Sequence, residues 1–345
     1  MEKIAVMTGG GDCSGLNAAI RAVVLTASGH DRETVGIRNG WKGLIDGDLL
    51  PLKDSSVSGI ISWGGTILGT SRIDPMKDPA DWAKIKKTID KNDIGSLIVI
   101  GGNGTLSAAY EVSEKGLPVV GIPKTIDNDI FGSDASIGFD TAISVVVEAI
   151  DRLRTTAESH HRIMIVEVMG RATGWIALMS GIAGGGDMIL IPEIHLSIDD
   201  IFRNLKARYE AGKKFSVVVI AEGTRHEDLT KTKIPEFSRD ACGHEKFVGV
   251  GNLLGKELDH RLGIETRVTI LGHTQRGGTP TAYDRVLATR FGISAVEQII
   301  TGNVGCMVAL QGTRIEPILL RDVASRIKPV DPGIYNHLGI LHNKR

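Results

Sequence analysis

Short apolar runs alternate with helix-like stretches along most of the chain. Residues 3–12 (KIAVMTGGGD) begin with an apolar run and end in glycines, and residues 16–28 (LNAAIRAVVLTAS) follow with a helical pattern. Further strands are predicted within residues 96–104, 118–125, 162–171, 188–193 and 215–223, and further helices within 105–116, 139–159, 174–184 and 197–214. Strands that are apolar on both faces and separated by helices predict an α/β fold of parallel βαβ units.

Residues suited to chemistry follow the predicted strands. In open parallel sheets, ligands bind beyond the carboxyl ends of the strands, where loops lead into helices. These ends carry residues 9–15, 101–105, 124–129, 169–171, 222 and 273–276. We therefore expect the functional residues to come from these loops.

Composition and charge narrow the class of protein. A chain of 345 residues is long enough for two lobes, and its net charge of −1 comes without a long basic run. Neither a nucleic acid nor a membrane surface is therefore an expected partner. Cys13, Cys242 and Cys306 are isolated, which argues for a reducing compartment and against a zinc site. The apolar run at the N-terminus is short for a signal peptide, and we expect a cytoplasmic protein.

The glycines gather in loops after apolar runs. The first loop (TGGGDCSGLN, residues 8–17) lies between a predicted strand and a predicted helix, so its N–H groups suit an anion. It departs from the dinucleotide pattern at Ser14 and from the P-loop pattern at Leu16. A second loop contains Gly104, which a bulky base or a polyphosphate could approach closely. A third ends in Arg72, a residue type that bridges phosphates.

Thr125, Asp127 and Asp129 alternate in the segment PKTIDND. In an extended chain the three side chains would project to one side, and two carboxylates would need a proton, a metal or a cation to compensate them. The alternative is a polar turn, which Asn128 and Asp129 favour. The spacing alone leaves both interpretations open.

Basic residues lie within or just after several predicted strands. With Glu222 they fit the recognition of an anionic polyol, although each could instead serve a structural ion pair. They are Arg162, Arg171, Arg267, His273 and Arg276.

These segments resemble the phosphofructokinase family, which phosphorylates the 1-hydroxyl of fructose 6-phosphate. The resemblance rests on PKTIDND, VEVMGR and GHTQRGG in this order. It implies two Rossmann-like lobes, each a mainly parallel sheet flanked by helices. Residues 1–139 with 275–325 would form the donor-nucleotide lobe. Residues 140–274 with 326–345 would form the sugar-phosphate lobe, with a variable insertion at about 224–250.

The resemblance also implies a role for individual residues. Asp127 would be the general base, Thr125 and Arg171 would stabilise the transferring phosphoryl group, and Asp129 would help to hold Mg²⁺. The implied donor-binding residues are Gly11, Ser71, Arg72, Asn103, Gly104, Thr105 and Lys124. The implied sugar-binding residues are Thr125, Asp127, Arg162, Met169, Gly170, Arg171, Glu222, Arg267, His273 and Arg276. Arg162 and Arg267 would come from a neighbouring subunit, which implies a homotetramer or a homodimer.

Three positions bear on the phosphoryl donor. Asn103 replaces an acid that ATP-using relatives carry, so any metal contact there would run through water. Lys124 matches pyrophosphate-using relatives, but these place an aspartate at the position of Gly104, where it would crowd a nucleotide. We therefore predict ATP as the donor. The alternatives are a pyrophosphate-dependent, reversible phosphofructokinase and a non-catalytic sugar-phosphate sensor. A nicotinamide-dependent dehydrogenase is a third alternative, which the fold suggests and the missing dinucleotide motif argues against.

Overall fold

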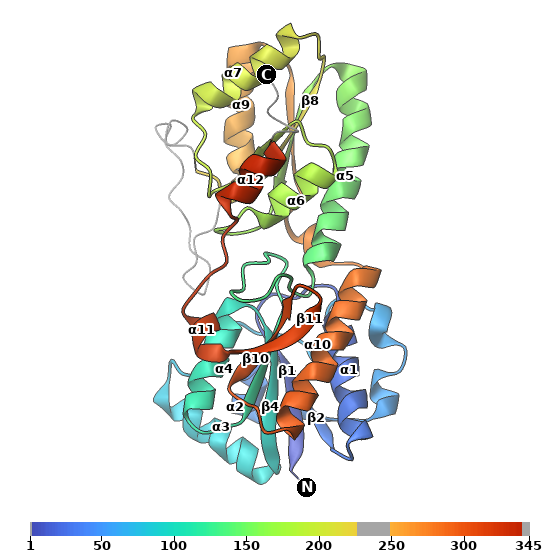
Figure 1. Cartoon of the computed structure of the whole chain (residues 1–345), viewed down its shortest axis with the longest axis vertical. Helices are drawn as coiled ribbons and strands as arrows, with labels where there is room; N and C mark the ends of the chain where they lie inside the picture. The colour runs from blue at the N-terminus through green and yellow to red at the C-terminus, as the bar shows by residue number, and fades with distance from the viewer. Residues whose placement is uncertain (1, 226–248, 340–345) are drawn as a thin grey trace. The chain divides into compact units, whose positions relative to one another are not determined.

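The computed structural model describes residues 2–225 and 249–339 (Figure 1). Most of the insertion predicted at about 224–250, including Cys242, lies outside the described residues. The chain divides into two compact units. Unit 1 comprises residues 1–141 and 276–328, and unit 2 comprises residues 142–275 and 329–345.

Unit 1 is built on a seven-stranded sheet in the order β11-β10-β5-β4-β1-β2-β3. Its five inner strands are parallel, and the edge strands β3 and β11 pair antiparallel with their neighbours. The strands are β1 Lys3–Thr8, β2 Thr34–Ile37, β3 Leu49–Leu52, β4 Ile94–Gly101, β5 Val119–Pro123, β10 Cys306–Gln311 and β11 Arg314–Leu319. The predicted mainly parallel sheet is confirmed, with one antiparallel strand added at each edge.

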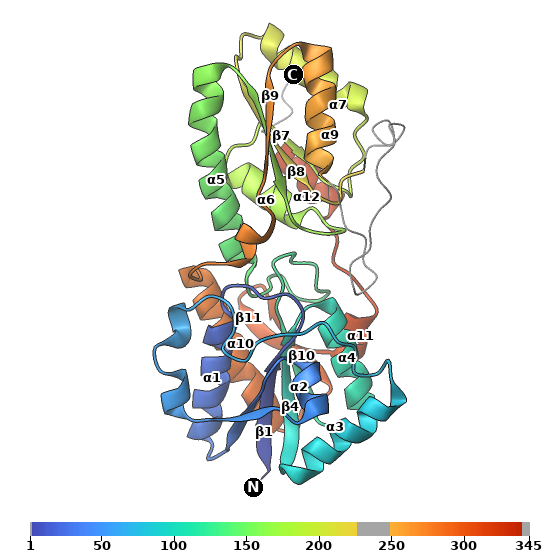
Figure 2. The same ribbon diagram turned by 180° about the vertical axis from the view of Figure 1, so that it is seen from behind.

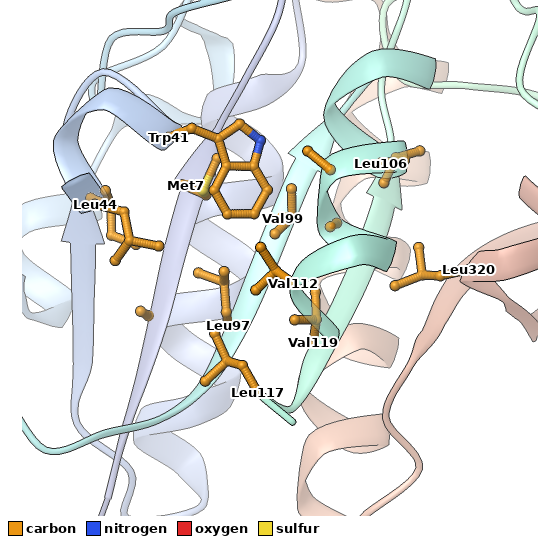
Figure 3. Close-up of a cluster of buried hydrophobic side chains, with 14 of the residues drawn as sticks. Met7, Trp41, Leu44, Leu97, Val99, Leu106, Val112, Leu117, Val119 and Leu320 are labelled. Carbon is orange, nitrogen blue, oxygen red and sulfur yellow. The ribbon is translucent and has the colours of Figure 1, made fainter. Parts of the chain in front are cut away.

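Helices cover both faces of this sheet (Figure 2). The helices are α1 Leu16–Gly29, α2 Trp41–Asp46, α3 Pro79–Lys91, α4 Asn103–Glu114, α10 Ala282–Ile300 and α11 Leu320–Ala324, with short 3₁₀ turns η1 Asp54–Val57 and η2 Ile60–Ser62. Helices α1 and α10 pack together on one face, where a side chain at Gly292 would meet the Cβ of Ala22 at 2.6 Å. On the other face, Leu97 and Val119 of the sheet are buried in one cluster with Trp41 of α2, Val112 of α4 and Leu320 of α11 (Figure 3).

Unit 2 is built on a four-stranded parallel sheet in the order β7-β8-β6-β9. The strands are β6 Ile163–Val168, β7 Met188–Leu190, β8 Ser216–Ala221 and β9 Thr266–Ile270. The helices are α5 Phe139–His160, α6 Trp175–Ala183, α7 Ile198–Glu210, α9 Val250–Leu262 and α12 Pro332–Gly339, and the first three residues of α5 belong to unit 1. The 3₁₀ turn η3 Gly272–Arg276 belongs to unit 2 up to Gln275 and to unit 1 at Arg276. A capping box of Ser197 and Asp200 begins α7, and the Tyr335 hydroxyl attaches α12 by donating to Ile189 O at 2.8 Å.

The strand ends lie where the sequence predicts them. β1, β4 and β5 end just before residues 9, 102 and 124, and β6 and β8 end just before residues 169 and 222. Each unit therefore presents the loops with predicted functional residues at the carboxyl ends of its own strands. Within residues 2–225 and 249–339, no helix has both the length and the apolar character needed to cross a lipid bilayer.

Candidate active site

The glycine loop, residues 9–15 between β1 and α1, is held through its carbonyl groups. The Lys124 Nζ donates to Gly9 O at 2.9 Å and also to Gly11 O. The Thr70 hydroxyl donates to Gly10 O at 2.7 Å. Because side chains satisfy three successive carbonyls, the loop keeps its shape without help from a ligand.

Lys124 is buried, with only 2% of its surface exposed. Burial lowers the pKa of its ammonium group to about 8, since a charge in a dry environment is costly. The nearby Cys13 thiol is also buried, which raises its pKa to about 12 and leaves it protonated at neutral pH. The sequence predicts that Lys124 binds the phosphoryl donor. In the structure its Nζ donates hydrogen bonds to carbonyls of the glycine loop.

Arg276 packs against the same loop. A side chain at Gly11 would overlap the Arg276 guanidinium, so the glycine lets this group lie close to the loop backbone. Nη1 donates to Asp12 O at 3.1 Å, and the Nε is buried without a hydrogen-bond partner among the described residues. The sequence assigns Arg276 to the sugar, whereas the structure places it in unit 1 beside the predicted donor loop. Its role with the sugar stays a prediction.

The segment 63–72 is anchored by an amide that the sequence analysis missed. The Asn17 side chain donates to Trp63 O and Gly64 O, each at 3.2 Å, and accepts from Ile67 N at 2.8 Å. In the sequence, Asn17 stands out as an amide side chain in the mainly apolar run that forms α1. Asn17 thereby positions the segment that ends in the predicted donor residues Ser71 and Arg72.

Ser71 joins this segment to the glycine loop. Its carbonyl accepts from Gly10 N at 2.9 Å, and its Oγ is buried without a hydrogen-bond partner in the described part of the chain. Arg72 is exposed. A buried hydroxyl that finds no protein partner is a good place for a ligand to bind.

The first turn of α4 contains the predicted donor residues Asn103, Gly104 and Thr105. Its N-cap is Gly102, which supplies no side-chain cap, so the first N–H groups can meet an anion. A Cβ added at Gly104 would find no atom within 4 Å, so open space adjoins this position. Thr105 is buried and packs against Gly9, which brings this helix end to the glycine loop.

The turn of residues 125–129 follows β5, and we call it the catalytic turn after the role that the sequence predicts for it. Thr125 Oγ1 accepts from Asp127 N at 3.2 Å and donates to Asp127 Oδ2 at 3.3 Å, and Asn128 has φ +52°. The polar turn is therefore confirmed, and the extended conformation is wrong because these local bonds turn the chain. The turn nevertheless brings the Thr125 hydroxyl and the buried Asp127 carboxylate together.

A magnesium site was predicted at Asp129 and, through water, at Asn103. The Asn103 Oδ1 is buried and has no hydrogen-bond partner among residues 2–225 and 249–339, and Asp129 is half-buried. Those residues also contain no group of three or more His, Cys, Asp or Glu that could hold a metal. Mg²⁺ commonly takes only one or two carboxylates and completes its shell with water and substrate phosphates. The oxygen atoms of Asp129 and Asn103 are the kind of metal ligands that such a site uses.

In unit 2, the loops after β6 and β8 bond to each other. Glu222 Oε1 accepts from Arg171 N at 3.0 Å. Gly170 has φ +144°, and a side chain at Gly223 would lie 1.8 Å from Arg171 O, so both glycines are needed. The predicted sugar residues Gly170, Arg171 and Glu222 thus form one cluster.

Gln275 extends this cluster, although the sequence analysis did not single it out. Its Oε1 accepts from Met169 N at 3.3 Å and its Nε2 donates to Gly272 O at 3.0 Å, so it holds η3 against the loop after β6. The predicted phosphate-binding residue His273 lies exposed in η3.

Arg162 and Arg267 lie away from that cluster. Arg162 precedes β6, and Arg267 pairs in register with Met164 near the amino end of that strand. Met169 lies seven steps along the strand from Arg162, or roughly 23 Å away. Both arginines bond to Glu265, and the bond from Arg162 is the main reason that the pKa of Glu265 is lowered. The structure therefore does not bring these two arginines to the sugar-binding cluster of their own unit.

A family model described as "Phosphofructokinase" matches residues 3–299, which is most of the chain. The chain belongs to the phosphofructokinase family. It is 51% identical over 336 residues to "ATP-dependent 6-phosphofructokinase 3" of Streptomyces coelicolor, covering 96% of this chain and 98% of that protein. It is also 49% identical over 341 residues to "Pyrophosphate--fructose 6-phosphate 1-phosphotransferase" of Amycolatopsis mediterranei, covering 98% of this chain and 99% of that protein.

A solved structure extends the comparison. The phosphofructokinase of Saccharomyces cerevisiae superposes with a TM-score of 0.82 at 32% identity, and the match covers 94% of this chain and 45% of that longer chain. The resemblance and the fold class predicted from the sequence are confirmed. The two curated phosphofructokinases differ in the donor that their names give, and their identities to this chain are nearly equal.

Proposed function

We propose that this protein transfers a phosphoryl group from ATP to the 1-hydroxyl of D-fructose 6-phosphate, with Mg²⁺, to give fructose 1,6-bisphosphate. The observation that carries the proposal is the buried Asp127 carboxylate, bonded to Thr125 in a turn of the same unit as the glycine loop. Phosphoryl transfer requires mainly positioning and charge neutralisation, and such a turn supplies a base in a fixed place.

Each unit would supply one group of residues. In unit 1, Asp127 would take the proton of the sugar hydroxyl, and Thr125 would donate to the transferring group. Arg72, Ser71, Gly11 and the first turn of α4 would bind the donor phosphates. Mg²⁺ bound by Asp129, and through water by Asn103, would neutralise charge on those phosphates.

In unit 2, the cluster around Glu222 would bind the sugar. The Glu222 carboxylate would accept from sugar hydroxyls, and the Arg171 guanidinium would stabilise the transferring phosphoryl group. Met169, Gly170 and His273 would complete the sugar site, with Arg276 as an additional predicted contact.

The open space at Gly104 supports ATP as the donor. A nucleotide is larger than pyrophosphate, and no side chain of residue 104 obstructs the first turn of α4. The Lys124 ammonium, which otherwise suggests pyrophosphate, already donates to two carbonyls of the glycine loop. A side chain that supports the loop is compatible with either donor, so Gly104 carries the greater weight.

Pyrophosphate as the donor is the second candidate. It is favoured by Lys124 and by the name of the 49% identical relative. The non-catalytic sensor rests on Asn103, and the intact Asp127, Asp129 and Arg171 argue against it.

The position of Arg162 and Arg267 supports a homo-oligomer with shared sugar sites. Their own sugar-binding cluster lies at the opposite end of β6, so a neighbouring copy is the more suitable recipient of these two cations. A homotetramer is the assembly that we propose, with a homodimer as the smaller alternative.

A product assay tests the proposed reaction. The protein is incubated with fructose 6-phosphate, Mg²⁺ and either ATP or pyrophosphate, and the product is analysed by ³¹P NMR. We expect a second phosphate ester on the 1-position of the sugar. Binding of fructose 6-phosphate without any turnover would favour the sensor instead.

A further inference from the structure

The catalytic turn continues into a loop, residues 130–136, that is anchored by the C-terminal part of unit 1. Two segments beyond residue 299, where the family match ends, contact this loop. One is the hairpin of β10 and β11, and the other is the segment 326–328, which we call the strap. The roles predicted from the sequence use neither segment.

The backbone of the strap pairs with the end of the catalytic turn. Lys328 N donates to Asp129 O at 2.9 Å, and Ile327 forms an antiparallel bridge with Ile130. The Arg326 guanidinium lies over the Phe131 ring, 4.8 Å from its centre. Three consecutive strap residues therefore contact three consecutive residues that begin with the predicted magnesium ligand.

The Lys328 side chain reaches further along the loop. Its Nζ donates to Ser133 O at 2.6 Å and to Asp134 O at 3.1 Å. The Asn128 side chain joins the same network, donating to Asp134 O at 3.3 Å and accepting from Ser136 N at 3.1 Å. One lysine thus satisfies carbonyls at 129, 133 and 134, which closes the loop onto itself.

The hairpin fixes the far part of the loop independently. Leu310 N donates to Ser133 Oγ at 3.0 Å, and Gly312 N donates to Asp134 Oδ2 at 2.6 Å. The hairpin thus fixes residues 133 and 134. Lys328 links these residues, through its side chain, to the Asp129 carbonyl, which its backbone N–H binds. The position of the catalytic turn then depends on that lysine.

We propose that Lys328 is a positioning residue that holds the catalytic turn, and with it Asp127 and Asp129, in the orientation needed for phosphoryl transfer. This inference rests on the proposed function. Lys328 acts through the backbone of the loop and does not itself contact a substrate. A displacement of a catalytic group by about 1 Å can reduce a rate by roughly a hundredfold, so loss of this anchor should lower turnover.

The test compares Lys328→Met with the wild type in two measurements. Hydrogen exchange of the free protein, followed by mass spectrometry, should be roughly tenfold faster in residues 128–136 of the variant, because Ser133 O and Asp134 O lose the ammonium donor and the loop can open more often. Steady-state kinetics should show kcat lowered by roughly tenfold or more, with KM for fructose 6-phosphate within about threefold. The control is Lys115→Met, which removes the ammonium that lies 5.4 Å from the Trp82 ring elsewhere in unit 1. It should change neither readout.

A folded Lys328→Met variant with unchanged kcat, or with unchanged exchange in residues 128–136, would overturn the proposal. If that variant does not fold, the exposed Arg326→Leu should move both readouts in the same direction by about threefold, and no change in either would overturn the proposal equally. If the wild type transfers no phosphoryl group, the proposed function fails, while the exchange measurement still decides whether Lys328 fixes the loop.

Discussion

Asp127 is the residue on which the proposed chemistry depends most. The residue is 4% exposed, and its carboxylate accepts a hydrogen bond from the Thr125 hydroxyl, so the carboxylate is held in place before a substrate arrives. A group that takes the proton only as the reaction proceeds should contribute to turnover more than to binding.

Asp127→Ser should therefore lower kcat by roughly a hundredfold or more, with a much smaller change in KM for fructose 6-phosphate. Steady-state kinetics measures both values. Asp90→Ser, which removes an exposed carboxylate from α3, is the control and should be as active as the wild type. Near-normal kcat in Asp127→Ser would remove this residue from the role of base.

Lys124 gives a second prediction at the residue scale, through the pH dependence of stability. Its pKa is lowered to about 8 in the folded protein, against 10.5 for an ordinary lysine. Between these values the unfolded chain keeps a proton that the folded protein has lost, so raising the pH favours the folded state. The cost of burying the charge is present in full below pH 8 and is relieved as the pH approaches 10.5.

The free energy of unfolding of the wild type, relative to Lys124→Met, should therefore rise by on the order of 2 kcal/mol between pH 7 and pH 10. Urea denaturation of both proteins at several pH values measures this difference. A difference that stays constant with pH would mean that the Lys124 ammonium is not buried as described.

At the scale of elements, the sequence predicted which loops follow strands but not how those loops contact one another. Alternating apolar runs and helical stretches place residues 9–15, 124–129 and 169–171 after strands, and the structure agrees. The antiparallel edge strands β3 and β11 were not predicted. The hydrogen bonds of the Lys124 ammonium were also not predicted, since the carbonyls that accept them are 115 and 113 residues away in the chain. Arg276 reaches Asp12 across 264 residues, a contact that no local pattern reveals.

The turn at 125–129 is a case where the sequence supported two local structures. Alternating Thr and Asp side chains suggested an extended segment, but a hydroxyl that bonds the backbone two residues on favours a turn. Asn128 adopts the left-handed conformation, which asparagine tolerates better than most residues other than glycine. The two interpretations could be separated only once these bonds were seen.

The first turn of α4 gives the prediction for this scale. Gly104→Asp should lower kcat/KM for ATP by roughly a hundredfold and should affect pyrophosphate much less, since its carboxylate would enter the open space beside the donor site. An acidic residue suits the first turn of a helix, so the variant should stay folded. Gly104→Asn is the control for size without charge. Equal ATP kinetics in Gly104→Asp and the wild type would show that residue 104 does not face the nucleotide.

At the scale of the whole molecule, the location of Arg162 and Arg267 predicts sites shared between subunits. Arg162→Ser and Glu222→Ser should each impair use of fructose 6-phosphate. Mixed oligomers of the two variants should recover some activity, because a fraction of sites would receive both intact residues.

The measurement is the activity of dissociated and re-associated mixtures relative to each variant alone, with mixing verified by native mass spectrometry. A second pair, Arg267→Ser with Glu222→Ser, should behave in the same way. As a control, Arg162→Ser mixed with Arg267→Ser should recover less, since both changes affect the same donated group. Verified mixtures without any recovery would contradict shared sites.

The choice of phosphoryl donor tests the account most directly, because the relatives with nearly equal identity are named for different donors. The measurement is kcat/KM of the purified wild type for ATP and for pyrophosphate, at saturating fructose 6-phosphate and Mg²⁺. The open space at Gly104 and the carbonyl-bound Lys124 predict a higher value with ATP. A higher value with pyrophosphate would contradict the proposed donor and assign the protein to the pyrophosphate-dependent phosphofructokinases.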